Sequence, residues 1–319
     1  MTRTANGLPT ISDAADFGRV AVLFGGLSAE RSVSLKSGHA VLAALQRRGV
    51  DAHGIDVGAD IVASLQRQHF DRAFIILHGA GGEDGVMQAL LQTLGIPYTG
   101  SGVLGSALAM DKIVSKRVWL GCGLPTPPFV VLDGSVETLT LAKELGMPLI
   151  VKPASEGSSI GMTRVDDPTA IRDAWEAAGG PDAPVLAERW VHGGEYTVAI
   201  VAGQVMPPIR VETPHVFYDF AAKYEADTTR YICPCGLPAE QEQALCQLAL
   251  TAFDVLGCRG WGRVDLFVDG EDNPWLIEAN TVPGMTDHSL VPMAAQVAGI
   301  EFDTLVWRIL ETSFTGTQA

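Results

Sequence analysis

Charged residues are scarce in this sequence, and basic residues are the scarcer kind. Charged side chains make up 18% of the 319 residues, and 22 Lys and Arg against 37 Asp and Glu give a formal net charge of −15. A surface of this sign repels phosphate backbones and anionic lipid, so we expect neither a nucleic-acid partner nor a membrane partner. A small anionic substrate is not excluded, because a local cluster of lysines can outweigh the total charge.

Cysteines and long apolar runs are also few. The five cysteines are an odd number, and Cys233-Pro234-Cys235 has no second pair at zinc-site spacing. Such cysteines are typical of reduced thiols in a cytoplasmic protein. No apolar run reaches the length of a membrane span, and residues 1–18 lack the apolar segment of a signal peptide. We expect residues 1–18 to be a disordered extension.

What the chain does contain is enough apolar material for more than one core. Hydrophobic residues make up 47% of the sequence, and its length favours two or three domains. Short apolar runs at 19–24, 50–57 and 73–77 alternate with helical patterns, which is typical of a parallel sheet with crossover helices. We therefore expect an N-terminal, Rossmann-like α/β domain over residues 19–117. It would include one helix over about residues 103–121.

Two glycine-rich loops follow strands of this expected sheet. The first covers residues 25–31, and the second, His78 to Gly85, follows the run at 73–77. Ligands of such sheets bind at the carboxyl ends of strands. Glycine-rich turns are common without a function, so each loop is weak support by itself and the pair together is stronger.

A central block over residues 118–190 places a lysine at the end of an apolar strand. Lys152 ends the run Pro148-Leu-Ile-Val, and a flexible loop over residues 155–161 follows it. A buried lysine requires an anionic partner, and a loop rich in backbone N–H groups can hold phosphate. The pattern differs from a P-loop, in which the glycines precede the lysine. The alternative is a surface lysine beside a loose hairpin.

The C-terminal block, residues 191–319, contains a long irregular stretch and then a hairpin. Thr213 to Leu237 is too long for a simple connection, so it is interpreted as a lid or binding loop. Two apolar runs, 261–268 and 275–282, flank a polar turn, which predicts antiparallel strands.

Acidic residues face each other in this predicted hairpin. If Val268 pairs with Trp275, then Asp265 lies opposite Glu278, inside an apolar frame. Carboxylates opposed across a ladder repel each other. A hard cation held by oxygen ligands would remove the repulsion. The alternative is a hairpin with ordinary surface acids.

The same register supplies a third oxygen ligand. It places Asn280 opposite Arg263 and on the same face of its strand as Glu278. Few protein ligands leave room for water and phosphate, which suits magnesium. The sequence therefore predicts a magnesium site formed by Asp265, Glu278 and Asn280.

Taken in order, these segments resemble the D-alanine–D-alanine ligase family of the ATP-grasp superfamily. The resemblance extends from about residue 19 to residue 312. It is carried by Phe24-Gly-Gly-Leu-Ser-Ala-Glu-Arg31, Leu77-His-Gly, Tyr98-Thr-Gly-Ser-Gly102, Met110-Asp-Lys112, Val151-Lys-Pro153, Glu156-Gly-Ser-Ser159, Trp261-Gly-Arg-Val-Asp265 and Glu278-Ala-Asn280 through Ser289-Leu290.

The resemblance implies a multidomain α/β and α+β protein with an ATP-grasp fold. The nucleotide would be held between the central and the C-terminal domains. ATP would phosphorylate the carboxylate of one D-alanine, and the amine of a second D-alanine would attack the acyl phosphate. The products would be D-alanyl-D-alanine, ADP and phosphate, and the dipeptide would serve peptidoglycan synthesis.

The resemblance also assigns roles to residues of this chain. Those that would bind ATP are Lys112, Lys152, Glu188, Glu195 and Lys223, with Glu188 at the adenine and Glu195 at the ribose. Those that would bind two Mg²⁺ or Mn²⁺ ions are Asp265, Glu278 and Asn280. Those that would bind the D-alanines or assist catalysis are Glu30, His78, Ser158, Lys223, Tyr224, Arg263, Gly284 and Ser289.

Other members of the superfamily are alternatives at this point. The second substrate could be D-lactate or D-serine, or the chain could be another ATP-grasp carboxylate–amine ligase. Outside the class, it could be a nucleotide-binding regulatory module without turnover. Tyr224 favours an amine as the second substrate, because relatives that make the ester tend to have Phe there. By resemblance, we expect a homodimer formed through the N-terminal domain.

Overall fold

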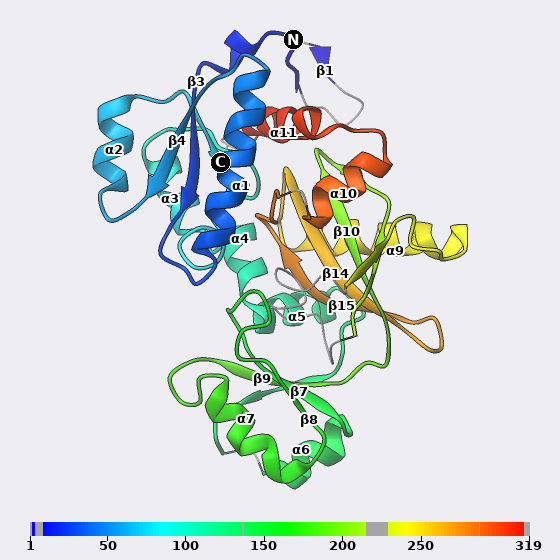
Figure 1. The fold of residues 1–319 in the computed structure, drawn as a ribbon. Coiled ribbons are helices and arrows are strands. Elements are labelled where there is room, and N and C mark those ends of the chain that lie inside the picture. The colour runs from blue at the N-terminus through cyan, green and yellow to red at the C-terminus, as the bar shows by residue number, and fades with distance from the viewer. Residues whose placement is uncertain (1, 4–8, 136, 215–228, 287, 316–319) are drawn as a thin grey trace.

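The structure is a computed structural model that describes residues 2–3, 9–135, 137–214, 229–286 and 288–315. Figure 1 shows a parallel-sheet domain, a smaller domain at the opposite end, and a larger antiparallel sheet beside both. No helix within these ranges is both long and apolar enough to span a bilayer.

The N-terminal sheet is parallel, as the alternating strand and helix pattern predicts. Its strands are ordered β4-β3-β5, and Leu23 at the centre of β3 is fully buried. The strands are β3 (Arg19–Gly25), β4 (Asp51–Val57) and β5 (Arg72–Ile75). The helices of this part are α1 (Arg31–Arg47), α2 (Ile61–Gln68), α3 (Val86–Thr93), α4 (Val103–Met110) and α5 (Lys112–Gly121).

The expectation of disorder over residues 1–18 is wrong for the segment that precedes β3. A 3₁₀ helix, Ala14–Phe17, buries Phe17 completely. The Phe17 ring meets Trp307 edge-on at 4.8 Å between centroids, and the Arg72 side chain donates a hydrogen bond to the Phe17 carbonyl at 2.6 Å. Trp307 belongs to α11 (Phe302–Glu311) at the other end of the chain. The burial of Phe17 therefore could not be predicted from the residues next to it in the sequence. Two short strands, β1 (Thr2–Arg3) and β2 (Pro9–Thr10), pair ahead of it.

The single helix expected over residues 103–121 is two helices. The chain leaves the helical conformation at Asp111, whose φ and ψ are −93° and 106°. The Asp111 carboxylate accepts hydrogen bonds from the backbone N–H groups of Ile113 at 2.9 Å and Val114 at 3.0 Å. Aspartate at this position satisfies N–H groups that the first turn leaves free. The break lets the Lys112 N–H reach the Ala154 carbonyl of the central domain at 2.9 Å.

The central sheet is antiparallel and has the order β6-β9-β7-β8. Its two helices pack against one face of the sheet, away from the rest of the molecule (Figure 1). The strands are β6 (Phe129–Leu132), β7 (Leu149–Pro153), β8 (Thr163–Val165) and β9 (Val185–Arg189). The helices are α6 (Thr138–Leu145) and α7 (Ile171–Ala177).

The C-terminal sheet follows the order β13-β12-β10-β14-β15, with β11 paired to β10. Its core lies against α9, while α10 and α11 share a core with the N-terminal sheet. The strands are β10 (Gly193–Val201), β11 (Gln204–Val205), β12 (Ile209–Glu212), β13 (Arg230–Ile232), β14 (Trp261–Asp269) and β15 (Pro274–Asn280). The helices are α9 (Ala239–Val255), α10 (Leu290–Val297) and α11.

The predicted lid falls partly inside the described chain. The stretch Thr213 to Leu237 was expected to be irregular, yet it contains β13, which pairs with β12. Residues 215–228 of the stretch interpreted as a lid lie outside the described residues.

The hairpin of β14 and β15 contains an irregularity that the sequence does not reveal. Val268 pairs with Pro274, so the expected pairing of Val268 with Trp275 is wrong. The register shifts between Asp265 and Leu266, which leaves Ile277 without a partner in the ladder. A β-bulge of this kind adds one residue to one strand.

The bulge restores the register that matters for the acids. Asp265 lies opposite Glu278, and Arg263 lies opposite Asn280, as the sequence predicts. The pairing needed for a metal site is therefore present.

Candidate active site

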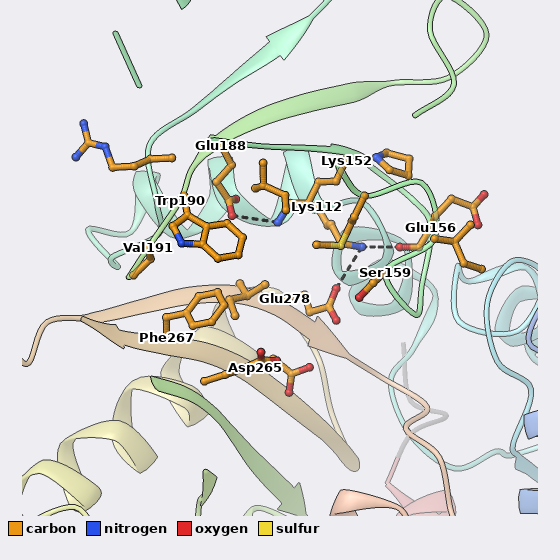
Figure 2. Close-up of a pocket in the computed structure, with 17 residues that line it drawn as sticks. Lys112, Lys152, Glu156, Ser159, Glu188, Trp190, Val191, Asp265, Phe267 and Glu278 are labelled. Carbon is orange, nitrogen blue, oxygen red and sulfur yellow. Dashed lines mark hydrogen bonds and ion pairs between the residues drawn. The ribbon is translucent and has the colours of Figure 1, made fainter. Parts of the chain in front are cut away.

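A cleft of about 780 Å³ separates the central sheet from the C-terminal sheet. This volume includes open solvent at the mouth of the cleft. Figure 2 shows charged side chains entering the cleft from both sheets. Six residues predicted to bind ATP or metal line it, namely Lys112, Lys152, Glu188, Glu195, Asp265 and Glu278.

One end of the cleft is cationic and is crossed by an ion pair. The Lys112 ammonium donates to the Glu156 carbonyl at 2.8 Å and lies 3.2 Å from the Glu278 carboxylate (Figure 2). Glu156 begins the flexible loop after β7, so Lys112 joins three segments of the chain at one point. A cation held by a carbonyl and a carboxylate is well placed to meet a phosphate.

The other end is built around a buried carboxylate. Glu188 is only 4% exposed, and its two oxygens lie 3.1 Å from the Lys152 ammonium and 2.5 Å from the Lys116 ammonium. Burial acts to raise the pKa of Glu188, but the charges of Lys116 and Lys152 outweigh it and lower that pKa. Burial lowers the pKa of Lys116 to about 8, so its ammonium is still charged at neutral pH.

Apolar side chains line the cleft between its charged groups. They are Ile150, Ile160, Met162, Val191, Phe267 and Ile277, together with the ring of Trp190. Glu195 lies among them on β10, opposite Phe267 of β14. Apolar side chains together with a carboxylate suit a heteroaromatic base that carries a hydrogen-bond donor.

The hairpin acids are compensated by protein cations in this structure. Arg263 makes two hydrogen bonds to Asp265, at 2.8 and 2.7 Å, and the Thr197 hydroxyl donates a third at 2.5 Å. Glu278 pairs with Lys112. Each of the two opposed carboxylates therefore has a basic side chain as its partner.

The donor set suits a hard divalent cation. Among the described residues, no three His, Cys, Asp or Glu side chains gather as metal ligands. The predicted set has two carboxylates and one amide, that of Asn280. All three offer oxygen atoms, which Mg²⁺ prefers. Both carboxylates line the cleft, and Asn280 follows Glu278 by two residues on β15, on the same face of that strand.

A second polar cluster joins the N-terminal domain to the loop after β7. Glu30 precedes α1 and is 9% exposed, and the Ser158 hydroxyl donates to its carboxylate. Ser158 has a φ of 51°, a left-handed conformation that costs a non-glycine residue energy. A Cβ on Gly157 would lie 2.7 Å from a Glu30 oxygen. The loop is thus folded closely around the Glu30 carboxylate.

His78 lies beside this cluster and is held as a neutral ring. Its Nδ1 is 2.7 Å from the Val282 carbonyl, which can only accept, so Nδ1 carries the proton. The other ring nitrogen lies 3.4 Å from the Ser37 hydroxyl. Burial lowers the pKa of His78, although the charge of Glu30 opposes this. The ring therefore stays neutral at physiological pH.

Glu83 is a buried acid that sequence reasoning did not single out. It lies in the second glycine-rich loop, is 9% exposed, and accepts a hydrogen bond from the Gly79 N–H at 2.6 Å. Burial, helped by the charge of Glu30, raises the pKa of Glu83 to about 8. The only sequence signal was an acidic residue in a loop at a strand end.

We predict that Glu83 makes the protein less stable as the pH rises. Its pKa rises from 4.5 to about 8 on folding, so between these values only the folded state holds the proton. Stability is then full below about pH 4.5 and is lost through this window, by an amount on the order of a few kcal/mol. Glu83→Gln, which resembles the protonated acid, should reduce this loss in urea unfolding measured across the window. The exposed Glu176→Gln is the matched control, and an identical pH profile for wild type and Glu83→Gln would contradict the prediction.

The remaining predicted residues are placed as follows. Ser289 precedes α10, and its hydroxyl accepts a hydrogen bond from the Thr286 N–H at 2.9 Å. Gly284 lies against it, since a Cβ at residue 284 would be 2.9 Å from the Ser289 oxygen. Lys223 and Tyr224 lie outside the described residues.

Two antiparallel sheets with a cleft between them, lined by lysines and acidic side chains, define the ATP-grasp class of protein. A family model described as "D-ala D-ala ligase C-terminus" matches residues 118–311, and "D-ala D-ala ligase N-terminus" matches residues 59–101. The chain belongs to the D-alanine–D-alanine ligase family.

Relatives match over nearly the whole chain. A D-alanine–D-alanine ligase of Methylococcus capsulatus is 59% identical over 95% of this chain and 98% of its own. One from Nitrosococcus oceani is 60% identical over 94% of this chain and 95% of its own. The crystal structure of the Bacillus anthracis D-alanine–D-alanine ligase complexed with ATP has a TM-score of 0.82 and is 32% identical, covering 93% of this chain and 97% of its own.

Proposed function

We propose that this protein is an ADP-forming ligase that joins two molecules of D-alanine through an acyl phosphate. The observation that carries the proposal is the cleft, whose lining brings together the basic and acidic side chains of Lys112, Lys152, Asp265 and Glu278. The relatives named above support the same activity, including one whose structure holds ATP. The dipeptide would serve peptidoglycan synthesis, as in the family.

ATP would lie with its base at the buried end of the cleft. The adenine would lie near the Trp190 and Phe267 side chains, which line the cleft, and Glu188 would accept a hydrogen bond from its amino group. Glu195, which also lines the cleft, would bind the ribose. The triphosphate would then extend toward Lys112 and Lys152, whose charges offset those of the phosphates. This orientation directs the terminal phosphate to the acids of the hairpin.

A divalent cation would be held by Asp265, Glu278 and Asn280. When bound, Mg²⁺ or Mn²⁺ neutralises phosphate charge and fixes the phosphate oxygens, and two ions sharing Glu278 would do so from two sides. Lys112, whose ammonium lies 3.2 Å from the Glu278 carboxylate, would also offset the negative charge of the phosphates. These groups favour transfer of a phosphoryl group rather than its binding alone.

The first D-alanine would bind where the second polar cluster meets the hairpin. Its ammonium group would pair with Glu30, beside the neutral His78. Its carboxylate would face Arg263 and the backbone N–H of Gly284, which would also stabilise the tetrahedral oxyanion formed later. A carboxylate is a poor acyl donor because oxide would have to leave. Phosphorylation replaces oxide with phosphate as the leaving group.

The second D-alanine would approach from the side of Ser289, which with Lys223 would hold its carboxylate. Its amine would attack the acyl carbon and form a C–N bond, and the tetrahedral oxyanion would then release phosphate as its C–O bond breaks. The amine must lose a proton for this attack, and the network of Ser158, Glu30 and Tyr224 would position it. Because Tyr224 lies outside the described residues, the preference for D-alanine over D-lactate rests on the sequence alone.

Two further proposals concern the whole molecule. We infer a cytoplasmic protein, which all five cysteines support because each is a free thiol. We also infer a homodimer formed through the N-terminal domain. Exposed Val86, Val103 and Leu104 of that domain, at 62%, 37% and 68% exposure, support this inference.

The proposed activity is tested by measuring phosphate release with ATP and Mg²⁺. D-Alanine should stimulate release strongly, L-alanine should not, and chromatography should find one D-alanyl-D-alanine for each phosphate. ATP hydrolysis that ignores both amino acids, or the absence of a dipeptide, would contradict the proposal. The result would also separate a working ligase from a nucleotide-binding regulatory module.

A further inference from the structure

A fully buried lysine lies just behind the cleft and is not explained by the proposed roles. Lys116 is 0% exposed and does not line the cleft, unlike Lys112 one helical turn earlier. Its ammonium lies 2.5 Å from the Glu188 carboxylate and donates to the Thr126 hydroxyl at 2.5 Å. The ring of Phe129 lies 5.5 Å from the same ammonium. Burying a lysine this completely is costly, so its location requires a reason.

The charges around Glu188 are not balanced one to one. One carboxylate has two ammonium partners, Lys152 at 3.1 Å on the cleft side and Lys116 at 2.5 Å behind it. If Lys152 turns toward a phosphate, a carboxylate with no second partner would be left buried and unpaired. Loss of one member of a buried ion pair is strongly destabilising, because it leaves a buried charge without compensation. Lys116 removes that cost.

The second ammonium is anchored independently of the cleft. Thr126, which accepts the hydrogen bond from Lys116, donates its own to the Leu276 carbonyl at 2.8 Å. The Leu276 N–H in turn donates to the Pro125 carbonyl at 2.9 Å. Leu276 lies on β15, two residues before Glu278. Lys116 is therefore fixed by the C-terminal sheet and by its own helix, whatever Lys152 contacts.

We propose that Lys116 is a positioning residue that holds the Glu188 carboxylate in place as the acceptor for an amino group on the base. Because Lys116 stays paired with Glu188, Lys152 is free to leave Glu188 and bind the phosphates. The Glu188 carboxylate held in this way would favour adenine over other bases. Guanine and hypoxanthine carry a carbonyl oxygen at the corresponding position, which a carboxylate repels. The inference rests on the proposed binding of ATP, although its test requires no D-alanine.

The test is calorimetric binding of ADP and of inosine diphosphate with Mg²⁺. Lys116→Met keeps an unbranched side chain that is one atom shorter and removes the charge. It should raise the Kd of ADP about tenfold or more, the effect of losing a charged hydrogen bond. The Kd of inosine diphosphate should change far less, so the preference for ADP should shrink by a similar factor. A merely structural loss would weaken both nucleotides equally.

The controls separate charge from folding. Lys143→Met removes an exposed lysine of α6 and should bind as wild type does. If Lys116→Met does not fold, the double variant Lys116→Met with Glu188→Gln removes both buried charges and is compared with Glu188→Gln alone. Because Lys116 acts through Glu188, these two should bind ADP equally. A further loss of tenfold in the double variant would overturn the proposal.

Two other outcomes separate the role of Lys116 from the proposed function. Wild-type Kd values and ADP preference in a folded Lys116→Met would overturn the proposal. If wild type binds ADP but releases no phosphate with D-alanine, the proposed function fails while the binding comparison still tests Lys116.

Discussion

Glu278→Gln is expected to lower kcat by about 100-fold or more, the usual cost of removing one electrostatic group from a charged transition state. Glu278 lies opposite Asp265 in the ladder and 3.2 Å from the Lys112 ammonium. Its replacement removes a charge that both the lysine and a bound cation need. The amide keeps the size of the side chain, so the loss would be electrostatic. The measurement is phosphate release at saturating ATP, D-alanine and Mg²⁺.

The matched control for this variant lies on the same hairpin. Glu271→Gln changes an exposed acid in the turn between β14 and β15, and it should leave kcat within about twofold of wild type. If Glu278→Gln retained a rate near that of wild type in Mg²⁺, the proposed metal site and the role of the hairpin would both be wrong.

Glu30→Gln is expected to lower kcat/KM for D-alanine by about 100-fold while leaving the KM for ATP nearly unchanged. Truncating one partner of a buried charge pair typically costs about 2–5 kcal/mol. The Glu30 carboxylate is buried, accepts the Ser158 hydroxyl and does not line the nucleotide cleft. The first D-alanine brings an ammonium group, and the variant has no anion to receive it.

Steady-state kinetics with each substrate varied in turn measure this split. Glu144→Gln, an exposed acid of α6, serves as the control and should not alter either parameter. An unchanged KM for D-alanine in Glu30→Gln, or an equal loss for ATP, would show that Glu30 holds the fold rather than the substrate.

The parts of the site that the sequence predicted well depend on local periodicity. Asp265 and Glu278 could be placed opposite each other because strand side chains alternate faces and the turn between the strands is short. The outer pairing of Val268 was nevertheless wrong, because a bulge at Ile277 depends on packing that a strand pattern does not encode. Asp265 and Glu278 are still opposite each other because the extra residue, Ile277, lies between Glu278 and the turn. It offsets the one-residue difference in pairing near the turn.

The misses have a common physical cause, which is burial by distant segments. Phe17 is buried by Trp307, and Lys116 by Glu188 and Thr126, so neither environment can be seen in neighbouring residues. Glu83 lies in the second glycine-rich loop, but its surroundings include Val282, which is distant in the sequence and makes a backbone hydrogen bond to it. The helix break at Asp111 did leave a signal, because aspartate is a common N-cap residue.

The central claim is that the oxygen of a D-alanine carboxylate is transferred to phosphate through an acyl phosphate. It is tested most directly with D-alanine labelled with ¹⁸O in its carboxylate, ATP and Mg²⁺, followed by mass spectrometry of the phosphate. The terminal phosphoryl group bonds to a carboxylate oxygen, and attack of the second amine breaks the bond between carbon and that oxygen. The released phosphate should therefore carry one ¹⁸O for each dipeptide formed. Unlabelled phosphate accompanying the dipeptide would contradict the account.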